Sequence, residues 1–176
     1  MTTTKAARIA LAVLLISIYS TLAFIRRVTN ALRDAGHLKT VVGIAFVLTA
    51  VAVMTLLIRT PALRKPKTLL LVAAAAVIYA LVIWPMESPE EKLHFIEYGI
   101  VGVLWFLSLP EAWATTKKYG VAALATVASG WLDEGIQALI PTRYYDLRDV
   151  GFNALAGLMA LTLFTVARAL AAPRSG

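Results

Sequence analysis

Residues 119–140 read YGVAALATVASGWLDEGIQALI, a mostly apolar run that carries an acidic pair and a glutamine near its end. About 20 mostly apolar residues cross a bilayer as a helix, so this run is long enough to span a membrane. A charged side chain at the centre of such a helix costs roughly 2.5–3.5 kcal/mol on insertion scales. We therefore expect Asp133, Glu134 and Gln137 to face a protein interior or a wet cavity, where they would mark a functional site.

The chain as a whole has the same apolar character. It is 60% hydrophobic and 15% charged, whereas soluble domains are about 45–50% apolar and about 25% charged. Nothing alternates with period two, and only helices or closed barrels span membranes. We predict an all-α fold, a polytopic membrane bundle of about six transmembrane helices. The predicted spans are residues 7–25, 40–58, 68–84, 93–109, 119–140 and 150–171.

The charge pattern excludes some classes of protein. The net charge is +7, but the basic residues cluster in short loops between apolar segments. This positive-inside arrangement is typical of a membrane protein, so we expect no nucleic-acid partner. The chain has no cysteine, which excludes disulfides and thiol catalysis. The first apolar run is longer than the core of a signal peptide, and we interpret it as a retained membrane helix.

The loop charges also suggest an orientation. The excess of Lys and Arg places both termini in the cytoplasm. An even number of crossings then brings the loops before residue 93 and after residue 140 to the same, extracytoplasmic face. Ser88 or Pro89, followed by Glu90 and Glu91, predicts a helix start there, since acids favour the positive end of the helix dipole.

Three segment ends near this face carry polar side chains at helical spacing. Residues three or four apart share a helix face, so Glu90 or Glu91 forms one stripe with His94, Glu97 and Tyr98. Glu134 and Gln137 form a second stripe, and Asp133 also faces Gln137. Asp146, Asp149, Asn153 and Gly157 form a third stripe, with Arg143 in the loop before it.

A purely structural interpretation covers some of these residues. Polar groups hold membrane helices together, although such a hydrogen bond averages only about 0.6 kcal/mol. Gln137 and Asn153 fit this role as well as a functional one, and Gly130 and Gly157 favour close helix approach. Arg143 fits a salt bridge to Asp146 or Asp149 at least as well as ligand binding. The tyrosines fit the aromatic belt of a membrane interface, namely Tyr98, Tyr144 and Tyr145.

The motifs together resemble the VanZ family of bacterial membrane proteins, named for a member linked to teicoplanin resistance. The start Glu91-Lys92-Leu93-His94-Phe95-Ile96-Glu97-Tyr98 is similar to the family's acid-Lys-spacer-His-Phe-x-x-Tyr start. Glu134-x-x-Gln137 is similar to its Glu-x-x-Gln helix, and Arg143, Asp146, Asp149, Asn153 and Gly157 follow its Arg-Asp-Asp-Asn-Gly run. Glu91 stands where the family usually has Asp, and one residue rather than two separates Lys92 from His94.

The resemblance covers about residues 68–172, which makes residues 1–67 a separate N-terminal two-helix segment. It implies a location in the bacterial cytoplasmic membrane and a role in the cell envelope that lowers glycopeptide susceptibility, with no particular reaction. The expected partners are membrane lipids and a lipid-linked cell-wall precursor or glycopeptide.

Two kinds of activity fit the polar residues best. In recognition of an envelope lipid, Arg143 would bind a phosphate or carboxylate bidentately and Lys92 would add a second charge. The other candidate ligand-binding residues are Glu91, Glu97, Tyr98, Gln137, Asp146, Asp149 and Asn153. In catalysis by a hydrolase or transferase, His94 and Glu134 would serve as general acid and base, because burial moves both pKa values toward neutrality.

Two further alternatives are weaker. A metal site would use His94, Glu97, Glu134 and Asp149 as a mixed nitrogen and oxygen set. A small transporter would use the intramembrane acids to relay protons or hold ions, although six helices without inverted repeats are a poor match to secondary transporters.

Overall fold

The computed structural model describes residues 3–141 and 145–172, and over these ranges it is helical with no strand. The all-α prediction is confirmed. The helices are α1 (Thr3–Asp34), α2 (Leu38–Arg59), the short 3-10 helix η1 (Pro61–Leu63), α3 (Pro66–Ile83), α4 (Pro89–Ser108), α5 (Thr115–Gln137) and α6 (Leu147–Ala171).

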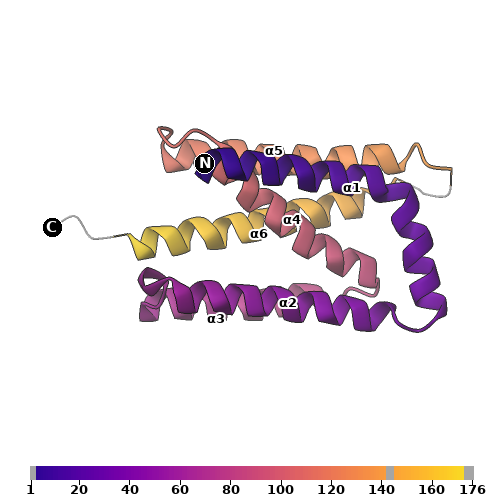
Figure 1. The fold of residues 1–176 in the computed structure, drawn as a ribbon, viewed down its shortest axis with the longest axis horizontal. Helices are drawn as coiled ribbons and strands as arrows, with labels where there is room; N and C mark the ends of the chain where they lie inside the picture. The colour runs from indigo at the N-terminus through magenta and orange to yellow at the C-terminus, as the bar shows by residue number, and fades with distance from the viewer. Residues whose placement is uncertain (1–2, 142–144, 173–176) are drawn as a thin grey trace.

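Helix α4 lies at the centre of the bundle. It crosses the molecule obliquely (Figure 1) and contacts α1, α2, α5 and α6, whereas α3 packs on α6. One apolar core joins Leu11 and Ile18 of α1 to Phe95 and Val101 of α4 and to Ala156 of α6. The segment before residue 68 therefore supplies part of the packing around α4.

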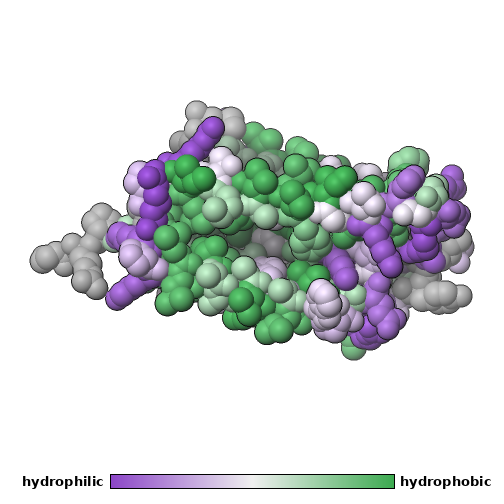
Figure 2. Space-filling model, turned by 90° about the horizontal axis from the view of Figure 1, so that it is seen from below, coloured by the Kyte–Doolittle hydropathy of each residue, from purple (hydrophilic) through white to green (hydrophobic). Residues whose placement is uncertain are grey.

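Four of the helices are long and apolar enough to cross a membrane, namely α1, α2, α3 and α6. Figure 2 shows the corresponding surface, a broad apolar belt between two hydrophilic ends. Helices α4 and α5 lie outside this group of four, and both carry charged residues within their length. The central position of α4 lets its Tyr98 and Ser108 side chains lie against other helices, where both are buried. These features together indicate a membrane protein.

The beginning of α4 follows the predicted pattern. Ser88 is the N-cap, and its hydroxyl oxygen accepts a hydrogen bond of 3.4 Å from the backbone N–H of Glu91. Pro89 follows at the start of the helix, where its missing N–H is no loss. Glu90 and Glu91 then lie in the first turn, next to the positive end of the helix dipole.

Helix α1 is longer than its apolar run predicts. It continues past Ile25 to Asp34, and Figure 1 shows this last part turning across the end of the bundle toward α2. The chain reverses at Gly36, whose φ of 73° is one that glycine adopts readily. The polar final turns of α1 thereby lie beside the start of α4.

Glycines let α4, α5 and α6 approach closely, as predicted for Gly130 and Gly157. A Cβ atom added to Gly157 would lie 2.2 Å from Cγ2 of Thr126 on α5. A Cβ atom added to Gly102 of α4 would lie 2.8 Å from the carbonyl oxygen of Gly157. These contacts leave no room for a side chain. Helices α4 and α6 therefore pack backbone to backbone at Gly102 and Gly157, and the Thr126 side chain of α5 packs directly on Gly157.

Candidate functional site

The start of α4, the end of α5 and the start of α6 meet at one end of the bundle (Figure 1). Six of the polar residues singled out in the sequence lie on the facing parts of these helices. We refer to them together as the polar cluster, which consists of His94, Tyr98, Asp133, Glu134, Gln137 and Asn153. Asp133, Glu134, Gln137 and Asn153 are all buried, at 0–2% exposure, so the cluster lies inside the protein and not against lipid.

Tyr98 and Asp133 connect α4 to α5 inside the cluster. The Tyr98 hydroxyl donates to Oδ2 of Asp133 at 3.0 Å and lies 3.2 Å from the carbonyl oxygen of Ser129. Gln137 donates from Nε2 to Oδ1 of Asp133 at 3.3 Å. Both carboxylate oxygens of Asp133 therefore have donors, and this part of the cluster satisfies its own hydrogen bonds.

The aromatic-belt interpretation is wrong for Tyr98. Its side chain is 0% exposed, and its hydroxyl points to α5 and not to a membrane interface. Tyr145, by contrast, is 44% exposed just before α6, which agrees with an interfacial position. Tyr144 lies outside the described residues.

Ser129 is a residue of the site that sequence reasoning missed. Its carbonyl oxygen accepts from Tyr19 of α1 at 3.0 Å as well as from Tyr98, and its hydroxyl accepts from Nε1 of Trp105 at 3.1 Å. Three aromatic side chains from two other helices thus converge on one turn of α5. A single serine in an apolar run gives no signal of this role, because it is compatible with any position in a membrane helix.

Glu134 joins α5 to the start of α6. One carboxylate oxygen, Oε2, accepts a hydrogen bond of 3.2 Å from the backbone N–H of Asp146. Asp146 is the N-cap of α6, and its own side chain accepts from the backbone N–H of Arg148 at 2.8 Å. The structure thus gives Asp146 a capping role. The second Glu134 oxygen, Oε1, is buried and has no hydrogen-bond partner within the described ranges.

Asn153 is the least satisfied member of the cluster. Its side chain is 0% exposed, and neither its Nδ2 nor its Oδ1 atom has a hydrogen-bond partner among residues 3–141 and 145–172. Gly130 on α5 makes room for it, since a Cβ atom added there would lie 2.9 Å from the Cβ of Asn153. An amide thus sits against the α5 backbone with a donor and an acceptor both unused.

His94 and Glu97 lie on the first turns of α4. Nδ1 of His94 is 3.6 Å from Oε2 of Glu97, which is too long for a hydrogen bond, and this buried nitrogen has no other partner in the described part of the chain. The His94 ring lies 6.1 Å from the Tyr98 ring, centroid to centroid. The Glu97 side chain is 42% exposed, so it borders the cluster instead of lying inside it.

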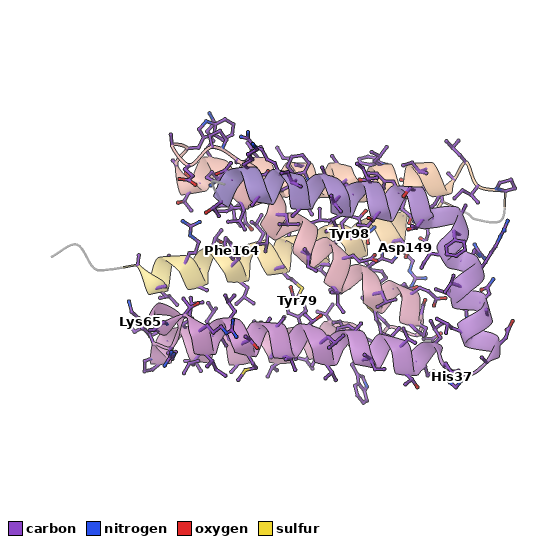
Figure 3. All side chains as sticks on the ribbon, viewed as in Figure 1. His37, Lys65, Tyr79, Tyr98, Asp149 and Phe164 are labelled. Carbon is purple, nitrogen blue, oxygen red and sulfur yellow. The ribbon has the colours of Figure 1, made fainter. Side chains whose placement is uncertain are left out.

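Three further predicted residues, Glu91, Lys92 and Asp149, lie near the end of the bundle. Glu91 and Lys92 are half-buried in the first turn of α4. Asp149 is in the first turn of α6, closer to the end of the bundle than Tyr98 (Figure 3). Burial raises the pKa of the Glu91 carboxyl, and the negative charge of Asp149 raises it further, while Arg148 opposes the shift. The starts of α4 and α6 are thus close enough to interact electrostatically. Arg143 lies outside the described residues.

In the part of the chain that the structure describes, the acids and histidines are not arranged as a metal site. Within residues 3–141 and 145–172, no three His, Asp or Glu side chains are grouped so that they could hold a metal ion. The metal alternative built on His94, Glu97, Glu134 and Asp149 therefore gains no support from the geometry. The arrangement instead offers unused hydrogen-bonding atoms next to two buried carboxyl groups.

No family model, curated protein or solved structure matches the chain.

Proposed function

We propose that the polar cluster binds the polar head group of a cell-envelope lipid or lipid-linked precursor, as a VanZ-like membrane protein of the bacterial cytoplasmic membrane would do. In this proposal both termini are cytoplasmic and the cluster lies toward the extracytoplasmic face. Binding there would lower susceptibility to glycopeptides such as teicoplanin by changing the access of the antibiotic to its cell-wall precursor.

The observation that carries this proposal is the set of buried polar atoms without partners. Glu134 Oε1, His94 Nδ1 and both polar atoms of the Asn153 amide have no hydrogen-bond partner among the described residues. Leaving a buried donor or acceptor unpaired costs about 1–3 kcal/mol, and each such group in a native structure calls for an explanation. Four unpaired atoms from three helices at one end of a bundle are better explained by a ligand than by packing.

The chemistry of these atoms limits the part of the ligand that they would bind. Asn153 offers a donor and an acceptor, and an ionised Glu134 offers an acceptor only. Asp133 lies next to Glu134 on α5, so a phosphate placed directly against this pair would meet like charge. The cluster is therefore suited to hydroxyl and amide groups, such as those of a sugar or a peptide stem. A phosphate would be bound by cationic side chains, for which Lys92 in the first turns of α4 and Arg143, the anion ligand that the sequence suggests, are the candidates.

A second candidate function is acid–base catalysis by a membrane-embedded hydrolase or transferase. The observation in its favour is that Glu134 is 1% exposed beside buried Asp133, with the unpaired His94 nitrogen in the same cluster. A carboxyl group in this setting can act as a general acid, and a neutral imidazole as a general base.

The test is binding of a purified lipid-linked cell-wall precursor to the full chain, measured by native mass spectrometry, with phosphatidylcholine as the reference lipid. The key variant is Asn153→Leu, which keeps the number and branching of the side-chain heavy atoms and removes both unpaired polar atoms. We expect the affinity to fall by about tenfold or more, while thermal stability holds or rises because the buried polar cost disappears. Unchanged precursor affinity in Asn153→Leu, or no preference for the precursor by the unaltered chain, would overturn the proposal.

Glu134→Gln separates binding from catalysis. Glutamine keeps the size of the side chain and its acceptor for the Asp146 N–H but removes proton transfer. If the cluster only binds, precursor affinity should fall by no more than about tenfold, because the amide NH₂ that replaces Oε1 is a donor where the carboxylate offers an acceptor. Teicoplanin susceptibility of cells that express the variant should follow that modest change. If it catalyses, turnover should fall by about 10²–10⁴ while binding persists. Glu87→Gln is the matched control, since it removes the same charge from an exposed residue just before α4.

A further inference from the structure

The last turns of α1 and the start of α4 enclose a small polar pocket that lies outside the polar cluster. Its volume is about 180 Å³, and its lining residues are Arg26, Thr29, Asn30, Arg33, Ser88 and Glu90. The pocket exists because α1 continues past its apolar run and turns across the end of the bundle (Figure 1). Residues 26, 30 and 33 share one helix face at spacings of four and three, and this face borders the start of α4.

The lining of the pocket carries net positive charge. Arg33 is ion-paired with Glu90, and its other guanidinium nitrogen donates to Oδ1 of Asn30 at 2.9 Å. Glu90 also accepts a hydrogen bond of 3.1 Å from the Ser88 hydroxyl. Two arginines thus face one carboxylate, and that carboxylate is already engaged.

Arg26 is the uncommitted cation of this pocket. Its side chain makes no hydrogen bond and no ion pair with any residue in the ranges 3–141 and 145–172. A half-buried guanidinium at a polar pocket, with no partner of its own, is suited to an anionic group because its planar fork matches phosphate oxygens. Asn30 and Thr29 add hydrogen-bonding groups to the same wall.

The pocket also lies at the correct level for a lipid head group. The hydrophilic ends of the molecule flank the apolar belt (Figure 2), and Arg26 directly follows the apolar run of α1. Phosphates of anionic lipids lie at this boundary, where basic residues attract them.

We infer that this pocket binds a phosphate group, with Arg26 as its principal ligand and Arg33 as the second, released from Glu90 when the anion enters. The inference is independent of the polar cluster, because none of the lining residues belongs to that cluster. The chemistry is that of a phosphate ester, and its source is either an anionic lipid head group or a soluble phosphate.

The test uses the full chain in detergent micelles, with phosphatidylglycerol, phosphatidylcholine and inorganic phosphate as separate probes in native mass spectrometry and thermal melting. We expect phosphatidylglycerol to bind more tightly than phosphatidylcholine, and Arg26→Gln to weaken its binding about tenfold. Arg27→Gln is the matched control, because it removes the same charge from an exposed residue that does not line the pocket. It should leave the affinity within about twofold.

Glu90→Gln tests for a gain in affinity, whereas Arg26→Gln tests for a loss. Glu90→Gln removes the carboxylate that competes for Arg33, so phosphatidylglycerol should bind several-fold more tightly even if the variant melts at a lower temperature. A purely structural Arg33–Glu90 pair predicts the melting change without the gain in affinity. Binding of inorganic phosphate with the same response to Arg26→Gln would assign a soluble source to the phosphate. The inference is overturned if Arg26→Gln and Arg27→Gln weaken binding equally, if Glu90→Gln fails to tighten it, or if neither phosphate source binds.

Discussion

The hydroxyl of Tyr98 lies 3.0 Å from Oδ2 of Asp133 and donates a hydrogen bond to it between α4 and α5. Both side chains are completely buried, so the Asp133 carboxyl group depends on protein donors in place of water. Because Oδ1 receives its hydrogen bond from Gln137 of the same helix, Tyr98 supplies the link between helices. This pair is therefore the side-chain hydrogen bond that joins α4 to α5 within the polar cluster.

Tyr98→Phe should destabilise the protein by about 1–3 kcal/mol, because Oδ2 of Asp133 would remain buried without a donor. The measurement is equilibrium unfolding of the full chain in detergent. Tyr145→Phe is the control, since Tyr145 is exposed and should change the unfolding free energy by less than about 0.5 kcal/mol. Equal effects of the two variants would show that the Tyr98 hydroxyl contributes no more than a surface hydroxyl.

Close packing of α6 on α5 gives a second prediction. Gly157→Ala should destabilise by about 1–3 kcal/mol through overpacking, because the new methyl group would lie 2.2 Å from Cγ2 of Thr126. A Cβ atom added to Gly151 on the same helix would have no atom within 4 Å. Gly151→Ala should therefore leave the unfolding free energy unchanged or raise it by up to about 1 kcal/mol.

The same contact predicts a rescue. Thr126→Ser removes the methyl group that clashes, so combining it with Gly157→Ala should recover part of the lost unfolding free energy. The double-variant cycle should show a coupling of about 0.5–3 kcal/mol. Additive effects would mean that the cost of Gly157→Ala comes from the backbone of α4 and not from Thr126.

The start of α4 gives a pH-dependent prediction. Burial and the nearby Asp149 raise the pKa of Glu91 above its ordinary value of 4.5. A raised carboxyl pKa means that the folded state binds the proton more tightly than the unfolded state, so stability is highest below pH 4.5 and falls as pH rises through the folded-state value. Glu91→Gln should remove this contribution.

The measurement is the melting temperature of the unaltered chain and of Glu91→Gln from about pH 4 to about pH 7. The unaltered chain should lose stability relative to the variant as the pH increases. Glu87→Gln, with an exposed carboxyl group, should not produce this trend. The opposite slope would mean that a cation dominates the surroundings of Glu91.

The sequence predicts the helices and the shared end of the bundle for a clear physical reason. Long apolar runs predict the helices, and two successive helices, α4 and α5, return the chain to the end of the bundle where α4 starts. The glycine contacts follow as well, because Gly130 and Gly157 are small residues in helices that also carry polar groups. Ser88 is recognisable as a cap because Pro89, Glu90 and Glu91 follow it.

The positions of side chains inside the site do not follow from the sequence in the same way. Tyr98 fits a membrane interface equally well from the sequence alone, since only the tertiary packing decides whether its ring faces lipid or another helix. Ser129 is a hydrogen-bonding centre through its carbonyl oxygen, a group that every residue has. The extension of α1 beyond Ile25 escapes a search for apolar runs, although Ile25, Val28 and Leu32 at helical spacing could have indicated it.

The packing of α1 gives the last prediction, which bears on the division of the chain near residue 67. Leu11 and Ile18 belong to the core around α4, and the Tyr19 hydroxyl donates to the Ser129 carbonyl oxygen at 3.0 Å. Arg8 also donates from Nε to the Ser108 carbonyl oxygen at 2.9 Å, at the end of α4. Expression of residues 68–172 alone should therefore give little monodisperse protein in detergent, because α4 and α5 would expose the surface that α1 covers.

Co-expression of residues 1–67 as a separate chain should restore the yield of this fragment, since the contacts are non-covalent. The measurement is size-exclusion chromatography of the tagged 68–172 fragment with and without its partner. A tagged 1–67 chain that carries Leu11→Ala, Ile18→Ala and Tyr19→Phe is the matched control and should restore less. If residues 68–172 are monodisperse alone and bind the lipid-linked precursor as the full chain does, the four-helix part is an independent unit and α1 is an accessory to it.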